Sequence, residues 1–367
     1  MRKNQLFFLV LFVMVFAFAA FSAADVAAQD ALDELIAAAQ AEGTLTTIAL
    51  PRDWCNYGAA IDGFKAKYGI EVNELNPDGA SADEIEAVKA NKDNKGPQAP
   101  DVLDVGYSFG PQLIEEGLVQ PYKVSTWDSI PNDAKHPDGY WYGDYYGIMA
   151  FEVNSDLVEN VPQDWADLLK PEYKNQFALS GDPRVSTQAQ MSVYAASLYN
   201  GGSLDDVTPG LDFFKQINEA GNFVPLIAKQ ATVAKGETPI IMRWDYNALA
   251  DRDVLDSNPT IEVVYPASGT IAGIYIQAIS AYAPHPNAAK LWMEYLYSDE
   301  GQNIWLSGYC HPIRFEDMKA RSALDPETEA KLPSFDGPVA FPSLEQLNAA
   351  NAAIAENWMA AVGADVK

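Results

Sequence analysis

The chain has 367 residues, and its 51 acidic residues against 24 basic ones give a formal net charge of −27. This acidity argues against a nucleic acid or an anionic membrane surface as partner, because binding either of them requires basic patches. The three histidines, His136, His285 and His311, lack the spacing of metal ligands, and no H-E-x-x-H or G-x-S-x-G motif occurs. The sequence therefore predicts no metal site, no cofactor and no catalytic turnover. A secreted carbohydrate-active enzyme remains an alternative, because it needs only one suitable pair of acids.

Residues 1–28 have the features of a secretory signal peptide. Arg2 and Lys3 precede an apolar run from Leu6 to Phe21, and small residues follow the run. An uncleaved membrane anchor is the weaker alternative, because the run is short for a span and a cleavable-looking stretch follows it. We therefore expect a periplasmic or otherwise extracytoplasmic protein. No later stretch is apolar for long enough to cross a bilayer.

The first part of the remaining chain alternates strands and helices. Strands are expected at 45–50, 69–75 and 99–106, and helices at 31–41, 60–68 and 81–92, the last with Ser81 as its cap. Strand, helix, strand, helix, strand indicates a parallel sheet with helices on both faces. The remaining length of about 340 residues suggests two domains.

The later part of the chain has a different pattern. We expect a long aromatic strand at 141–158, a helix, turn and strand over 166–184, helices at 186–202 and 210–221, and strand, aromatic loop and helix over 236–253. Further strands are expected at 261–269 and 273–283, one long amphipathic helix at 287–306, and a last helix near 344–362. No internal repeat or low-complexity tract occurs.

Candidate ligand residues follow the predicted strands, because ligands of open α/β sheets lie beyond the carboxyl ends of strands. These candidates are Arg52, Asp53, Trp54, Tyr57, Tyr107, Ser108, Arg184, Ser186, Thr187, Arg243, Trp244, Asp245 and Tyr246, together with Tyr275 of the strand at 273–283. All of them are aromatic, hydroxyl-bearing or charged, and they belong to both halves of the chain. This distribution predicts a cleft that closes on a small solute.

The two cysteines, Cys55 and Cys310, are 255 positions apart. The oxidising compartment of an exported protein favours a disulfide between them, and two free buried thiols are the weaker alternative. If they pair, the loop at 49–58 lies against the segment at 308–314.

Several stretches, in their order along the chain, resemble the periplasmic substrate-binding proteins of ABC importers. "DPRVST" at 182–187 resembles a motif of ferric-ion and thiamine binders, and "WCNY" at 54–57 resembles the opening loop of polyamine binders. "NAAKLWMEYLYSDEGQ" resembles the late helix of this group, and "GYCHPIR" resembles its second interlobe segment. The resemblance covers essentially the whole mature chain.

The resemblance implies an α/β fold of the type 2 periplasmic-binding class, with two lobes that are each a mostly parallel sheet flanked by helices. The expected first lobe is 30–148 plus 272–306, and the second is 149–271 plus 307–367, joined by crossing strands at 145–154 and 273–282. The implied protein is a monomer that captures a small charged solute by hinge closure and delivers it to a membrane permease.

The charge of the solute stays open at the level of sequence. A polyamine-like cation would lie between Trp54, Tyr57, Trp244 and Tyr246, with Asp245 and Asp53 as counter-charges and with Trp54 facing Trp244 across an open cleft. A phosphorylated or carboxylated anion would use Ser186 and Thr187 at a helix N-terminus, with Arg52, Arg184 and Arg243. An equal alternative is that Ser186 only caps its helix and that Arg184 only pairs with Asp182.

Two further alternatives concern the class of protein. Ferric-ion binders of this group use adjacent tyrosines where this chain has Trp244-Asp245-Tyr246, so iron is disfavoured, and the adjacent pair Tyr145-Tyr146 is expected to pack at the crossing strand. A structural or adhesion protein without a small ligand is the remaining class.

Overall fold

The computed structural model describes residues 23–332 and 339–367. Most of the predicted signal peptide lies outside these residues, and residues 23–28 form the beginning of helix α1 (Ala23–Glu42). Among the described residues, no helix combines the length and the apolar character that crossing a membrane requires.

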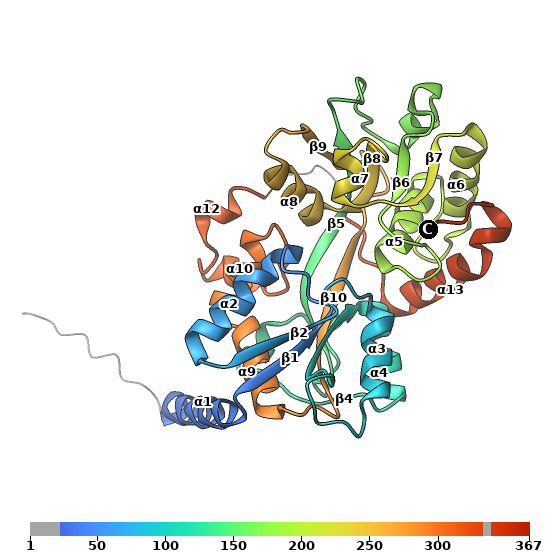
Figure 1. Cartoon of the computed structure of the whole chain (residues 1–367). Coiled ribbons are helices and arrows are strands. Elements are labelled where there is room, and N and C mark those ends of the chain that lie inside the picture. Colours follow the sequence, from blue (N-terminus) through green and yellow to red (C-terminus); the bar gives the residue numbers. More distant parts are fainter. Residues whose placement is uncertain (1–22, 333–338) are drawn as a thin grey trace, which may run out of the picture.

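Two bodies make up the molecule, and strands β5 (Tyr142–Asn154) and β10 (Ala272–Ser280) run between them (Figure 1). The first half of β5 pairs with β10, and its second half pairs with β8 (Ile240–Trp244) and β9 (Ile261–Val264). One continuous strand is therefore shared by both bodies, as expected for a crossing strand.

The first body contains the N-terminal strands, which are β1 (Thr44–Ile48), β2 (Glu71–Leu75), β3 (Val102–Gly106) and β4 (Val119–Gln120). Its helices include α2 (Tyr57–Tyr68), α3 (Ser81–Ala90) and α4 (Gly110–Glu115). Strands β1 and β2 are parallel, whereas β3 and β4 are antiparallel to β10. Asp101 joins the two groups, because its N–H donates to the Thr46 carbonyl at 2.8 Å and its side chain accepts from the Thr46 N–H at 2.7 Å.

The second body is built on β6 (Phe177–Leu179), which is parallel to both β7 (Phe223–Ile227) and β8. Its helices are α5 (Thr187–Tyr199), α6 (Thr208–Ala220), α7 (Gln230–Ala234), α8 (Asp245–Leu255) and the late helix α13 (Leu344–Ala361). Strand β7 was not predicted, because its mostly half-exposed residues and its central Pro225 give no alternating pattern.

The long helix predicted at 287–306 is two helices, α9 (Pro286–Leu296) and α10 (Asp299–Ser307). Ser298 begins the second one by accepting the Gly301 N–H at 3.1 Å. The amphipathic pattern continues across the break because both helices face the core, where Trp292 and Trp305 are fully buried.

The chain after α10 forms β11 (His311–Pro312), α11 (Phe315–Ala320) and α12 (Pro326–Glu329). Arg314, just before α11, donates to the Ser129 hydroxyl and to the Tyr297 carbonyl, each at 2.6 Å, and both acceptors belong to the first body. These bonds connect the segment before α11 to the first body. The predicted lobe limits stay a prediction.

Candidate functional site

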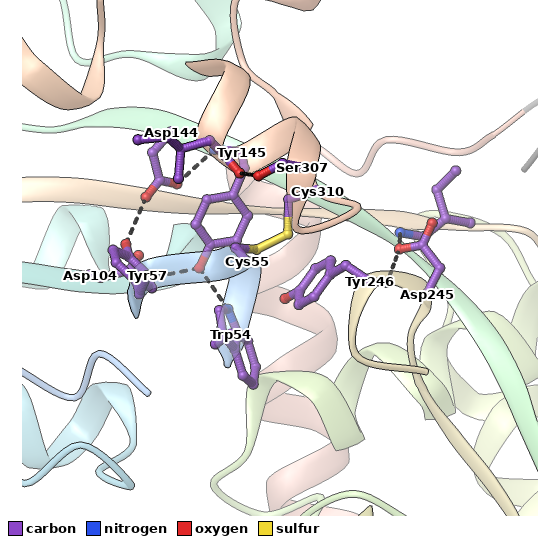
Figure 2. The surroundings of a disulfide bond; sticks show 12 residues. Trp54, Cys55, Tyr57, Asp104, Asp144, Tyr145, Asp245, Tyr246, Ser307 and Cys310 are labelled. Atoms are coloured by element: carbon purple, nitrogen blue, oxygen red, sulfur yellow. Dashed lines mark hydrogen bonds between the residues drawn. A yellow bond between two sulfur atoms is a disulfide. The ribbon is translucent and has the colours of Figure 1, made fainter. Parts of the chain in front are cut away.

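A disulfide between Cys55 and Cys310 holds the loop at 49–58, as predicted (Figure 2). Both cysteines are buried, and their Cα atoms lie 5.5 Å apart. The close approach requires Gly308, because a Cβ atom there would lie 2.5 Å from the carbonyl carbon of Cys55. Asn56 adds a hydrogen bond to the Ser307 hydroxyl at 2.9 Å. The disulfide therefore fixes the loop at 49–58 onto the segment that follows α10.

A cavity of about 170 Å³ lies between the two bodies, and we call it the cleft cavity. Its walls are Ala49, Pro51, Trp54, Gly79, Ala80, Ser81, Glu84 and Asp104 of the first body, Ser180, Val185, Ser186, Thr187 and Gln188 of the second, and Tyr275 of β10. This volume is below the range of about 300–1,000 Å³ that is usual for drug-sized ligands. The cleft cavity therefore fits a small solute.

Trp54 is held in place by aromatic neighbours from α8 and from the two crossing strands. Its ring lies edge-on to Tyr246 at 5.4 Å and to Tyr275 at 5.7 Å between ring centroids. Its indole N–H donates to the Tyr145 hydroxyl at 2.8 Å (Figure 2). Tyr145 in turn stacks on Tyr275 at 5.7 Å. The apolar wall of the cavity is thus connected directly to β5 and β10.

Another part of the cavity wall is acidic. Asp104 is 6% exposed, and its Oδ2 accepts from the Tyr57 hydroxyl at 2.8 Å and from the Tyr145 hydroxyl at 3.0 Å. Its Oδ1 is buried and has no hydrogen-bond partner among the described residues. Glu84, also buried, accepts the Asp104 N–H at 2.9 Å. One buried oxygen of an acid that lines the cavity is therefore left without a donor among the described residues.

A third acid, Asp144, lies behind Asp104 on β5, and we call Glu84, Asp104 and Asp144 the floor cluster. Asp144 Oδ2 lies 3.4 Å from the Tyr57 hydroxyl and accepts from the Gln277 side chain at 3.2 Å. Burial raises the pKa of Asp104 to about 7, and hydrogen bonds from its neighbours oppose this rise. Burial also raises the pKa values of Glu84 and Asp144 well above their usual range.

The second body contributes the N-terminus of α5 to the cavity. Ser186 is the N-cap of this helix, and its hydroxyl accepts the Ala189 N–H at 3.5 Å. Thr187 approaches β3 of the first body so closely that a Cβ atom on Gly106 would lie 2.8 Å from its hydroxyl oxygen. The two bodies therefore come together at this helix terminus, where backbone N–H groups favour negative charge.

Four of the predicted ligand residues line the cleft cavity, namely Trp54, Ser186, Thr187 and Tyr275. Tyr57 is fully buried behind Asp104 and supports the floor cluster instead. Asp53 is exposed outside the cavity. Tyr107 lines a different hollow, and Ser108 shares a shallow pocket with Arg184.

Each of the three predicted arginines is paired with carboxylates and lies away from the cleft cavity. Arg52 pairs with Asp62 and Glu74, Arg184 with Asp182 and Asp365, and Arg243 with Glu152 and Asp251. The described residues that line the cavity include no Lys, Arg or His. The cavity wall thus has carboxylates and no basic side chain.

The predicted aromatic loop at 244–246 is instead the junction of β8 and α8, because the strand ends at Trp244 and the helix begins at Asp245. Trp244 is fully buried, stacks on Tyr246 at 6.3 Å and leaves no room for a side chain at Gly273. This corrects the prediction that Trp244 faces Trp54 across an open cleft. Trp54 contacts Tyr246 and Tyr275 instead.

Asp245 is also buried at this junction and serves the fold. Its Oδ1 accepts the Ile148 N–H at 3.0 Å, and its Oδ2 accepts from the Tyr265 hydroxyl at 3.0 Å. Burial raises the pKa of Asp245 to about 7. Asp245 does not line the cleft cavity, so the structure does not bring it to the solute position that the sequence suggested.

The sequence did not predict that the floor cluster and the turn at 79–81 belong to the site. The strand-end rule was not applied to the second strand, and applying it there would have pointed to residues 76–81 at the start of α3. Ser81 was predicted as the cap of α3, but Ala80 is the N-cap, and the Ser81 hydroxyl accepts the Gly106 N–H at 3.1 Å. Asp104 lies within a strand, where a carboxylate gives no signal of its own.

Comparison with known proteins identifies the family. The model of a family described as bacterial extracellular solute-binding protein matches residues 98–337. The chain belongs to this family. It is a solute-binding protein of the ABC-transporter type, as the order of its sequence motifs suggested.

The individual relatives have low sequence identity to this chain. The chain is 30% identical over 292 residues to an uncharacterized protein of Haemophilus influenzae, covering 74% of this chain and 79% of that protein. It is 26% identical over 233 residues to the spermidine/putrescine-binding periplasmic protein of Escherichia coli K12, covering 59% of this chain and 63% of that protein. The fold is similar to that of the periplasmic binding protein AfuA of Actinobacillus pleuropneumoniae with fructose 6-phosphate bound, at a TM-score of 0.66 and 20% identity, covering 87% and 98%.

Proposed function

We propose that the cleft cavity binds a small solute with a cationic group, which the protein delivers to an ABC permease without chemical turnover. The observation that carries this proposal is the charge of the cavity wall. Glu84 and Asp104 line it, and no Lys, Arg or His lines it among the described residues. Buried carboxylates are costly unless a cation or hydrogen-bond donors compensate them, so an ammonium group from the solute fits this wall.

The aromatic residues support the same solute class. Trp54 and Tyr275 lie at the cavity wall, and their ring faces attract cations and cover apolar methylene groups. A small amine could therefore place its charged end at Asp104 and its carbon chain against Trp54. The E. coli relative named for spermidine and putrescine agrees with this assignment.

A second candidate is an anionic solute at the N-terminus of α5. Ser186, Thr187 and Gln188 line the cavity there, and the helix terminus favours negative charge. The AfuA structure, which has fructose 6-phosphate bound, supports an anion as the second candidate. An anion would have to lie beside Glu84 and Asp104, which makes it the weaker candidate.

A thermal-shift screen tests the proposal, because a solute that binds only the folded state raises the melting temperature. The screen compares putrescine, spermidine and thiamine with fructose 6-phosphate, citrate and ferric ion. We expect a shift with at least one amine and none with the anions. A shift with an anion alone would contradict the cationic assignment, and a shift with ferric ion alone would favour the iron-binding alternative.

Two variants connect the binding to the cavity. Glu84→Gln should weaken amine binding, because it removes a carboxylate from the wall, whereas Ser186→Ala should weaken the binding of an anion. Asp78→Asn is the matched control, because Asp78 is an exposed acid one residue from Gly79 of the cavity. Glycoside hydrolysis that one acid substitution abolishes would favour the carbohydrate-active alternative. The expected monomer is a separate prediction, and chromatography with light scattering measures the molar mass that tests it.

A further inference from the structure

The floor cluster places three buried carboxyl groups together behind the cleft cavity. Glu84 is 1% exposed, Asp104 is 6% exposed and Asp144 is fully buried. Three ionised carboxylates in one buried site would repel each other and would all lose their hydration. At least one of the three therefore carries a proton when the cavity is empty.

The surroundings of Asp104 supply hydrogen bonds and no positive charge. The titratable groups that face it are Tyr57 of α2, Glu84 of α3, Asp144 and Tyr145 of β5, Tyr246 of α8, Tyr275 of β10, and Tyr297 just after α9. The neutral Gln277 of β10 completes the set through its bonds to Tyr57 and Asp144. Among the described residues, none of these groups is a Lys, Arg or His.

Asp104 and Asp144 are the pair that can hold the proton. The Tyr57 hydroxyl lies 2.8 Å from Asp104 Oδ2 and 3.4 Å from Asp144 Oδ2, so the two carboxyls meet at one hydroxyl, which can donate its single proton to only one of them. Asp104 Oδ2 already accepts from two hydroxyls, whereas its buried Oδ1 has no donor among the described residues. Asp104 lines the cleft cavity, so a solute that binds there lies next to this pair.

We propose that a cationic solute displaces this proton, so that solute binding is linked to proton release. This inference rests on the function proposed above. In the step, the ammonium group pairs with the Asp104 carboxylate, the carboxyl O–H bond of the Asp104–Asp144 pair breaks, and the proton leaves to water. The net charge of the site is unchanged, because one positive charge replaces another.

Isothermal titration calorimetry with putrescine and with spermidine measures the release directly. Titration at one pH in two buffers of different ionisation enthalpy gives the number of protons released per bound amine. Because the pKa of Asp104 is about 7, we expect release of about one proton at pH 6 and little release at pH 9. The affinity should fall about tenfold per pH unit as the pH falls below about 7, because the proton then competes with the amine.

Two variants place the effect on Asp104. Asp104→Asn should bind the amine weakly and release no proton at any pH, whereas Asp144→Asn should still release one at pH 6, because burial keeps the pKa of Asp104 raised. Asp78→Asn should release the same number of protons as the wild type. Amine binding without proton release at pH 6 would overturn the inference and leave the proposed function in place. Failure of both amines to bind at any pH between 5 and 9 would overturn both.

Discussion

Two buried clusters of acids in this protein differ in how their charge is balanced. In the second body, Arg243 pairs with Glu152 at 3.1 Å and with Asp251. In the first body, the floor cluster contains three carboxyls, and no basic residue faces them in the described part of the chain. The first arrangement contains its own cation, whereas the second contains none and includes two acids, Glu84 and Asp104, that line a cavity.

This difference separates a structural site from a ligand site better than a raised pKa does. Burial raises the pKa of Glu152 to about 8, although Arg243 opposes the rise. Burial likewise raises the pKa of Asp104 to about 7. Desolvation therefore acts in both clusters, and the missing cation together with the open cavity distinguishes the floor cluster.

The largest expected effect is on stability, from Arg243→Met. The change leaves Glu152 and Asp251 buried beside each other without a cation, and losing one partner of a buried ion pair costs about 3–5 kcal/mol. Urea unfolding of the two proteins measures the difference. Arg252→Met is the control, because the exposed pair of Arg252 with Asp253 should contribute less than about 1 kcal/mol. Equal effects of the two changes would contradict the structural role of the Arg243 cluster.

The next effect is the pH dependence of Asp104→Asn in the absence of solute. The folded-state pKa of about 7 is higher than the unfolded value of about 3.9, so the folded state binds more protons between these pH values. The free energy of unfolding of the wild type should therefore fall, relative to that of the variant, by about 2–3 kcal/mol from pH 5 to pH 8. Unfolding of both proteins at the two pH values gives this number. A constant difference would show that Asp104 does not hold a raised pKa.

The smallest of these effects is the loss of amine binding in Trp54→Ala, and this variant is best compared with Trp244→Ala. Trp54→Ala should weaken amine binding by roughly 1–2 kcal/mol, because it removes an aromatic wall of the cavity, and it should leave the protein folded. Trp244→Ala should mainly lower the free energy of unfolding, because it empties a fully buried position. Calorimetry and thermal unfolding of both variants test this division. Normal amine binding by Trp54→Ala would place the solute elsewhere.

The sequence predicted most of the fold, because its strands and helices carry clear apolar patterns and its motifs occur in a familiar order. The aromatic strand was predicted at 141–158 and its crossing role was implied by the family resemblance, and the structure has it as β5. The disulfide was predicted from two cysteines in an exported chain. The break at Ser298 was not predicted, because both helices keep one buried face across it.

The site was harder to predict, because strand ends indicate which loops meet but not how deeply each side chain is buried. Trp54 and Ser186 were placed at the cavity by this rule. Trp244 and Asp245 also lie at the end of a strand, yet the junction of β8 and α8 buries them. Asp104 gave no local signal, because its role depends on Tyr57, Tyr145 and Asp144, which only the folded chain brings together.

A crystal structure with a bound amine tests the central claim most directly. If the floor cluster receives the charge of the solute, the ammonium nitrogen of putrescine or spermidine should lie about 3 Å from a carboxylate oxygen of Asp104. The carbon chain of the amine should then lie against Trp54 and Tyr275. An amine bound outside the cleft cavity, or an anion at the N-terminus of α5 in its place, would contradict the account.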